Sequence, residues 1–204
     1  RFFGIHDRGT TLLEVKPITG CNAGCTFCSV DEGIGSKKFY DFVVEREYLV
    51  EETKKLLQFK NKQGMHIYIN VHGEPLLYYD IVNLVRDLKA IPSIKDITII
   101  TNGMLLTEQL IKDLDAAGLT TVNISVSAID NLLAKQVMGT EAYSIEKIKN
   151  ILTYASKHAK FKIIITPVYV NSQNEQEMEK LIMFSKEIGC DIKIQKFCYN
   201  KAGR

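Results

Sequence analysis

Strand-like and helix-like segments alternate along the whole chain, and this alternation constrains the fold more than any other feature. Six short runs are apolar and rich in β-branched residues, as strands are; they are Leu12–Ile18, His66–Val71, Asp96–Thr101, Thr121–Val126, Lys162–Val168 and Ile192–Phe197. Five longer segments carry helical periodicity; they are Arg46–Lys60, Leu77–Lys89, Thr107–Ala117, Ser144–His158 and Gln176–Ile188. The order strand then helix therefore repeats five times and ends on a sixth strand.

This order predicts an α/β fold with a parallel sheet. Parallel strands are buried on both faces, so they are almost continuously apolar, and each needs a crossover helix to reach the next. A doubly wound open sheet and a partial barrel both fit the pattern, and periodicity does not choose between them. In either fold, functional residues are expected where loops converge at the C-terminal ends of the strands.

Length and composition suit a single domain. With 204 residues, 46% of them hydrophobic, the chain can bury a substantial core. We expect residues 1–204 to form one domain, and, since the sequence starts at Arg1 rather than Met, to be a fragment of a longer protein. A net charge of +2 gives no support for a nucleic-acid partner.

The chain shows no sign of export or membrane insertion. No apolar run approaches the roughly 20 residues that span a bilayer, and the N-terminus lacks the plan of a secretory signal. We therefore expect a cytoplasmic protein without a membrane span. The five cysteines are an odd number, which argues against a disulfide framework and, in a reducing compartment, favours metal or redox chemistry.

Three of these cysteines, Cys21, Cys25 and Cys28, crowd into eight positions just beyond the first predicted strand. Three soft ligands on one loop suit an iron–sulfur cluster or zinc. A four-iron cubane normally takes four thiolates, so three thiolates would leave one iron open to a small molecule. The alternative is a non-catalytic zinc or iron–sulfur binding module, in which His72 could complete a tetrahedral zinc site.

The cysteine spacing, with an aromatic residue just before the third cysteine, resembles the signature of the radical S-adenosylmethionine enzymes. The resemblance implies that Cys21, Cys25 and Cys28 ligate three irons of a 4Fe-4S cluster. The amino and carboxylate groups of S-adenosylmethionine would chelate the fourth iron, and Phe27 would pack near the adenine.

The segment 71–77, Val-His-Gly-Glu-Pro-Leu-Leu, resembles the Gly-Gly-Glu-Pro segment of that family, whose backbone carbonyls bind the ammonium of the methionine moiety. Pro75 would fix the turn, and Gly73 would allow a ligand to approach the backbone. Glu74 has two interpretations: it orients the loop through backbone amides, or it meets the ammonium directly. His72 stands where the family often has its first glycine, and we expect it to be a tolerated loop residue.

Two further segments, 99–107 and 122–127, resemble the third and fourth strands of the branch that includes the molybdenum-cofactor synthase and peptide-modifying enzymes. In that branch polar groups at these strand ends reach the methionine carboxylate and the ribose, which implies such roles for Thr101, Asn102, Ser125 and Ser127. Strand alternation would point Ser125 and Ser127 the same way. The alternative is that these polar groups only cap strand ends or turns.

Three other features remain open. Where many relatives carry a basic residue that pairs with the carboxylate, this chain has Tyr78-Tyr79-Asp80, so other donors must serve. Isolated Cys190 and Cys198 suit a second cluster or a substrate-facing thiol less well than ordinary burial. The basic residues near the end of the sequence suit either phosphate or a solvated strand edge; they are Lys193, Lys196, Lys201 and Arg204.

The resemblance selects the partial barrel: a six-stranded, TIM-like (β/α)6 fold with parallel strands. It also implies an activity, the reductive cleavage of S-adenosylmethionine to a 5′-deoxyadenosyl radical that abstracts hydrogen from an unidentified substrate. The implied partners are that substrate and a low-potential electron donor such as ferredoxin or flavodoxin.

Overall fold

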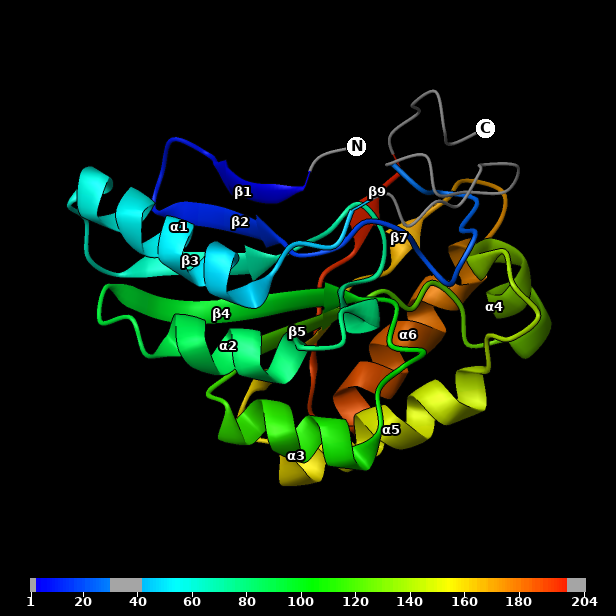
Figure 1. The fold of residues 1–204 in the computed structure, drawn as a ribbon. Helices are drawn as coiled ribbons and strands as arrows, with labels where there is room; N and C mark the ends of the chain where they lie inside the picture. Colours follow the sequence, from blue (N-terminus) through cyan, green and yellow to red (C-terminus); the bar gives the residue numbers. More distant parts are fainter. Residues whose placement is uncertain (1–2, 30–41, 198–204) are drawn as a thin grey trace.

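The computed structural model describes residues 3–29 and 42–197, which form a mostly parallel sheet with helices along its outer face (Figure 1). The strands of the main sheet follow the order β1-β2-β3-β4-β5-β6-β8. They are β1 (Gly4–Asp7), β2 (Leu12–Lys16), β3 (Met65–Ile69), β4 (Ile94–Thr101), β5 (Thr121–Ile124), β6 (Lys162–Ile165) and β8 (Asp191–Ile192). Strands β7 (Val168–Tyr169) and β9 (Gln195–Lys196) form a separate parallel pair.

Helices connect the parallel strands as the alternation predicts. They are α1 (Arg46–Lys60), α2 (Ile81–Lys89), α3 (Glu108–Ala116), α4 (Asn131–Met138), α5 (Ile145–His158) and α6 (Glu175–Glu187), with a 3-10 helix η1 (Pro75–Leu77) before α2. Helix α3 is capped at its start, since Thr107 Oγ1 accepts a hydrogen bond from the Leu110 N–H at 3.1 Å. Helix α2 begins later than predicted because Pro75 starts the short η1 turn instead.

The parallel strands share one buried row of apolar side chains. Register pairs Val15 with Ile69, Ile69 with Ile99, Ile99 with Val122, and Val122 with Ile163. All five side chains are at most 5% exposed and belong to one hydrophobic cluster with the helices. Burial of this row fixes the register, because a slip by one residue would turn every apolar side chain to the other face.

The predicted partial TIM-like barrel is confirmed: the described strands form a curved, unclosed sheet that begins at β1 and ends at β8. Strand β1 was not predicted; it is short and antiparallel to β2. The fifth predicted strand divides into β6 and β7 at Thr166 and Pro167, since proline cannot donate to a ladder. The sixth predicted strand likewise divides into β8, which pairs with β6, and β9, which pairs with β7.

Helix α4 was also absent from the sequence analysis. It has only eight residues, between an Asp130 cap whose carboxylate accepts from the Leu133 N–H and a left-handed Gly139. A helix this short carries too little periodicity to identify from one sequence. Among the described residues, no helix combines the length and apolar character needed to cross a bilayer.

Candidate active site

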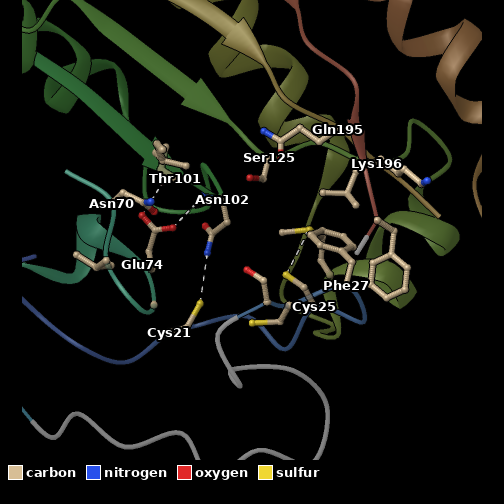
Figure 2. Close-up of a pocket in the computed structure, with 18 residues that line it drawn as sticks. Cys21, Cys25, Phe27, Asn70, Glu74, Thr101, Asn102, Ser125, Gln195 and Lys196 are labelled. Carbon is tan, nitrogen blue, oxygen red and sulfur yellow. Dashed lines mark hydrogen bonds between the residues drawn. The ribbon is translucent and has the colours of Figure 1, made fainter. Parts of the chain in front are cut away.

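A cleft of about 380 Å³ lies at the C-terminal ends of the strands, where the loops after β2, β3 and β4 meet β9 (Figure 2). Nine of the eleven predicted site residues line it; they are Cys21, Cys25, Phe27, Cys28, Gly73, Glu74, Thr101, Asn102 and Ser125. Pro75 and Ser127 are not among its lining residues. The fold therefore brings together groups from four separate segments of the chain.

The first part of the cysteine loop is held against the segment after β3, in an arrangement that we call the strand-side clamp (Gly20, His72, Gly73 and Glu74). The Gly20 N–H donates to the His72 carbonyl at 3.2 Å, and the Glu74 N–H donates to the Gly20 carbonyl at 2.8 Å. Gly73 has a φ of +150°, and a Cβ on it would lie 1.7 Å from the Gly20 oxygen. Gly73 is thus required by the approach of another backbone, whereas the sequence analysis expected the approach of a ligand.

The middle of the loop is held by the C-terminal end of α4, in a second arrangement that we call the helix-side clamp (Gly24, Thr26, Val137, Met138 and Gly139). The amides of Gly24 and Thr26 each donate at 2.9 Å, to the carbonyls of Met138 and Val137 respectively. A Cβ on Gly139 would lie 1.9 Å from the Gly24 oxygen. These bonds use carbonyls that a helix end leaves without intrahelical partners.

Glu74 is 1% exposed and ties the strand-side clamp to the end of β4. Its carboxylate accepts from the Leu76 N–H at 3.0 Å, from Thr101 Oγ1 at 2.6 Å and from the Asn102 N–H at 2.8 Å. Burial raises the pKa of Glu74 to about 7, against the lowering effect of these three donors. Two of these donors are backbone amides, as the orienting interpretation of Glu74 expects.

Asn102 links β4 directly to the cysteine loop. Its Nδ2 donates to Asn22 Oδ1 at 2.7 Å and lies 4.0 Å from Cys21 Sγ, while its Oδ1 accepts from the Met104 N–H at 2.9 Å. Figure 2 shows Asn102 between Glu74 and Cys21. The Asn102 side chain therefore holds the cysteine loop at Asn22 and lies next to Cys21.

Ser125 and Ser127 occupy different environments, although alternation predicted a shared direction. Strand β5 ends at Ile124, so strict alternation stops before either serine. Ser125 is half-buried and lines the cleft. Ser127 is 1% exposed, and its Oγ accepts from the Val168 N–H at 3.1 Å. Its described contact joins the end of β5 to β7, as the capping alternative supposed.

Several cleft residues were not identified from the sequence as site residues. Asn70 lines the cleft after β3, and its carbonyl accepts from Lys16 Nζ at 2.5 Å. Met138 comes from the unforeseen α4, and Gln195 and Lys196 come from β9. Their common position at strand or helix ends was the only available signal. Lys196 had been noted only as part of a basic run.

The other features noted in the sequence lie elsewhere. Neither His72 nor Cys190 lines the cleft among the described residues. Cys190 Sγ lies 3.9 Å from the Ile188 carbonyl, and burial raises the pKa of its thiol to about 11. Cys198, Lys201 and Arg204 lie outside the described residues.

The donor set of the cleft suits an iron–sulfur cluster with an open iron. The three thiols are half-buried and face one cleft, and its described lining contains no fourth cysteine and no histidine. The one lining carboxylate, Glu74, is already engaged by three donors. Among residues 3–29 and 42–197, no three cysteine, histidine or acidic side chains are gathered closely enough to enclose a single metal ion.

Comparison with known proteins identifies the class. The profile of the Radical SAM superfamily matches residues 15–185, and the chain belongs to this superfamily. Members of the family are enzymes that use a 4Fe-4S cluster and S-adenosylmethionine. Membership confirms the resemblance seen in the cysteine loop and supports an enzyme over a non-catalytic binding module.

Two curated relatives illustrate the similarity. The chain is 36% identical over 189 residues to an uncharacterized protein of Methanocaldococcus jannaschii, which covers 91% of this chain and 43% of that protein. It is 30% identical over 198 residues to the GTP 3′,8-cyclase of Listeria welshimeri, which covers 97% of this chain and 56% of that enzyme. The chain thus spans about half the length of these relatives.

Solved structures share the fold. Streptococcus suis SuiB bound to S-adenosylmethionine superposes with a TM-score of 0.71 at 21% identity, over 93% of this chain and 41% of SuiB. Methylornithine synthase gives 0.69 at 15% identity, over 93% of this chain and 54% of that chain. At such low identity these matches support the architecture alone.

Proposed function

We propose that this chain is the catalytic core of a radical S-adenosylmethionine enzyme, and that residues 1–204 form one domain of a longer protein. Cys21, Cys25 and Cys28 would hold the cluster. When bound, the cluster would supply the electron that cleaves S-adenosylmethionine to methionine and a 5′-deoxyadenosyl radical, which abstracts hydrogen from the substrate. The observation that carries this proposal is the convergence of three thiols, without a fourth described cysteine or histidine, on one cleft at the strand ends.

The chain's own residues would orient the cosubstrate. The clamps hold the first part and the middle of the cysteine loop, so the backbone around Cys21 and Cys25 is set before a ligand arrives. Gly73 exposes backbone at the cleft, where its carbonyl could receive the methionine ammonium. Phe27, with Ile100 and Val168 in the same lining, offers an apolar surface for adenine, and the Ser125 hydroxyl could meet the ribose.

This chain has no basic residue after the Glu-Pro segment to pair with the methionine carboxylate, and Lys196 is the candidate for that role. It is the one lysine or arginine in the described lining of the cleft, to which β9 contributes it (Figure 2). We propose that Lys196 pairs with the methionine carboxylate. Lys196→Ala should raise the KM for S-adenosylmethionine about tenfold, the effect of losing about 1.4 kcal/mol of binding, without changing the iron content. The neighbouring Lys193→Ala, outside the lining, is the matched control.

The chemistry of the cluster also indicates the electron donor and the cellular compartment. A low-potential protein such as ferredoxin or flavodoxin would reduce the cluster, since such clusters reach strongly negative potentials. Chemistry that depends on reduced cysteine ligands suits the reducing cytoplasm. The substrate is a separate molecule that reaches the open side of the cleft.

The decisive test is anaerobic reconstitution. We expect about four irons per chain and the formation of 5′-deoxyadenosine when dithionite and S-adenosylmethionine are added. Cys25→Ala should lose both, whereas Cys190→Ala, a cysteine outside the cleft, should retain both. One zinc per chain, or product formation that survives Cys25→Ala, would contradict the proposal.

A further inference from the structure

Tyr143 is a buried tyrosine whose hydroxyl has no hydrogen-bond partner among the described residues. The side chain is 1% exposed, and its Oη is one of three buried side-chain polar atoms without a hydrogen bond in the described structure, with Thr53 Oγ1 and Asn123 Oδ1. Leaving a buried donor unsatisfied is unfavourable, because the group has lost its bonds to water. An unsatisfied hydroxyl of this kind is explained if it gains a hydrogen-bond partner when a cofactor binds.

The position of Tyr143 indicates which partner. It follows α4 by a few residues, just beyond Gly139, where the chain presses against the cysteine loop. The helix-side clamp brings Met138 Sδ to 3.8 Å from Cys25 Sγ. Burial raises the pKa of the Tyr143 hydroxyl far above its ordinary value, and the charge of Cys25 raises it further.

The hydrogen-bonding character of Cys25 changes when it binds a metal. As a thiol, its Sγ–H is a weak donor, and the Met138 thioether at 3.8 Å is a suitable weak acceptor. As a metal-bound thiolate, the same sulfur carries no proton and accepts hydrogen bonds. Met138 cannot donate one, whereas the tyrosine hydroxyl can.

We propose that the Tyr143 hydroxyl donates a hydrogen bond to the Cys25 sulfur when that sulfur ligates iron, and that this bond raises the reduction potential of the cluster. The inference rests on the proposed function, because it requires a cluster on the three cysteines. A donor to a cluster sulfur stabilises the reduced, more negative state more than the oxidised state, so it favours reduction. Tyr143 is therefore a positioning residue that acts through Cys25.

The test compares Tyr143→Phe with Thr53→Val. Each replacement removes a buried, unpartnered hydroxyl with little change of shape, but Thr53 lies in α1 and does not line the cleft. In the metal-free protein both variants should melt at or above the wild-type temperature, by a few degrees. After reconstitution, Tyr143→Phe alone should lose this advantage, since only its hydroxyl gains a partner.

The reconstituted proteins give the second measurement. A redox titration followed by EPR should show that Tyr143→Phe makes reduction about tenfold less favourable, which is about 59 mV for a one-electron couple. In resonance Raman spectra, an Fe–S(Cys) stretch that shifts in D₂O in the wild-type protein should lose that shift in the variant. Thr53→Val should keep the wild-type potential and the wild-type spectrum.

The outcomes separate the two proposals. If the wild-type protein takes up no four-iron cluster, the proposed function fails. If the cluster forms and Tyr143→Phe leaves its potential and its Raman bands unchanged, the proposed function stands and the role of Tyr143 is refuted. A stabilisation by Tyr143→Phe that is equal with and without the cluster would also refute it.

Discussion

The two clamps on the cysteine loop use the same device in different settings. In each, a glycine lies so close to a loop carbonyl that a Cβ would overlap it, at 1.7 Å for Gly73 and at 1.9 Å for Gly139. The strand-side clamp joins the ends of neighbouring strands β2 and β3. The helix-side clamp joins the loop to a short helix more than a hundred residues further along the chain. The comparison shows that one loop is held both by the neighbouring strand and by a helix much further along the chain.

The largest effect is expected from Gly73→Ala. The clash involves the backbone oxygen of Gly20, which cannot move without opening the ladder between β2 and β3, and the φ of +150° adds strain. We expect a loss of about 5 kcal/mol or more in the free energy of unfolding, measured by urea denaturation. Gly189→Ala, also at positive φ but with open space around it, is the control and should cost about 1 kcal/mol, the penalty for a Cβ in the left-handed region.

Gly139→Ala should break the helix-side clamp at a somewhat lower cost, about 4 kcal/mol. Its φ of +63° is better tolerated, and the end of a short helix can shift more easily than a strand end. The variant should keep its sheet but lose iron on reconstitution, measured by circular dichroism and iron analysis. Full iron content in Gly139→Ala would show that the helix-side clamp is dispensable.

The clamps should also differ in their response to pH, because only the strand-side clamp contains a buried carboxylate. The Glu74 pKa is raised from 4.5 to about 7 on folding, so the folded protein holds a proton that the unfolded chain releases between these values. The free energy of unfolding of the metal-free protein should therefore fall as pH rises through this window, by about 3 kcal/mol at 1.36 kcal/mol per pH unit. Urea denaturation between pH 4.5 and 8 measures the slope.

Glu74→Gln provides the comparison for that slope. Its amide does not titrate, so its free energy of unfolding should lack the Glu74 component of the pH dependence, even if the variant is less stable throughout. Parallel curves for the two proteins would mean that Glu74 titrates normally in the folded state.

The smallest expected effects on stability are those of replacing the two serines that follow β5, and they should differ between the two positions. Ser127→Ala leaves the Val168 N–H without its acceptor and should cost about 1 to 2 kcal/mol. Ser125→Ala removes a half-buried hydroxyl in the cleft and should change stability by less than about 0.5 kcal/mol, while raising the KM for S-adenosylmethionine. Equal KM values for the two variants would contradict the division of roles, and thermal melts with steady-state kinetics measure both.

The order of strands and helices could be predicted because it depends on local patterns. Apolar β-branched runs identified β2 to β6, and helical periodicity identified the helices that connect them. The parts that were missed, β1, α4 and the break at Pro167, are short or irregular, and tertiary contacts rather than periodicity stabilise them. The strand-side clamp could be located because Gly73 lies in a recognisable motif.

The sequence by itself determined the chemistry: three thiols on one loop, a buried glutamate, and the alternation that places both at the C-terminal ends of parallel strands. These follow from residue type and spacing, which are local properties of the chain. Only the tertiary structure decided that Ser125 faces the cleft while Ser127 does not, that Lys196 lines the cleft, and that Met138 contacts Cys25. Those facts depend on where strands end and how distant segments pack, and no local pattern encodes contacts between residues so far apart.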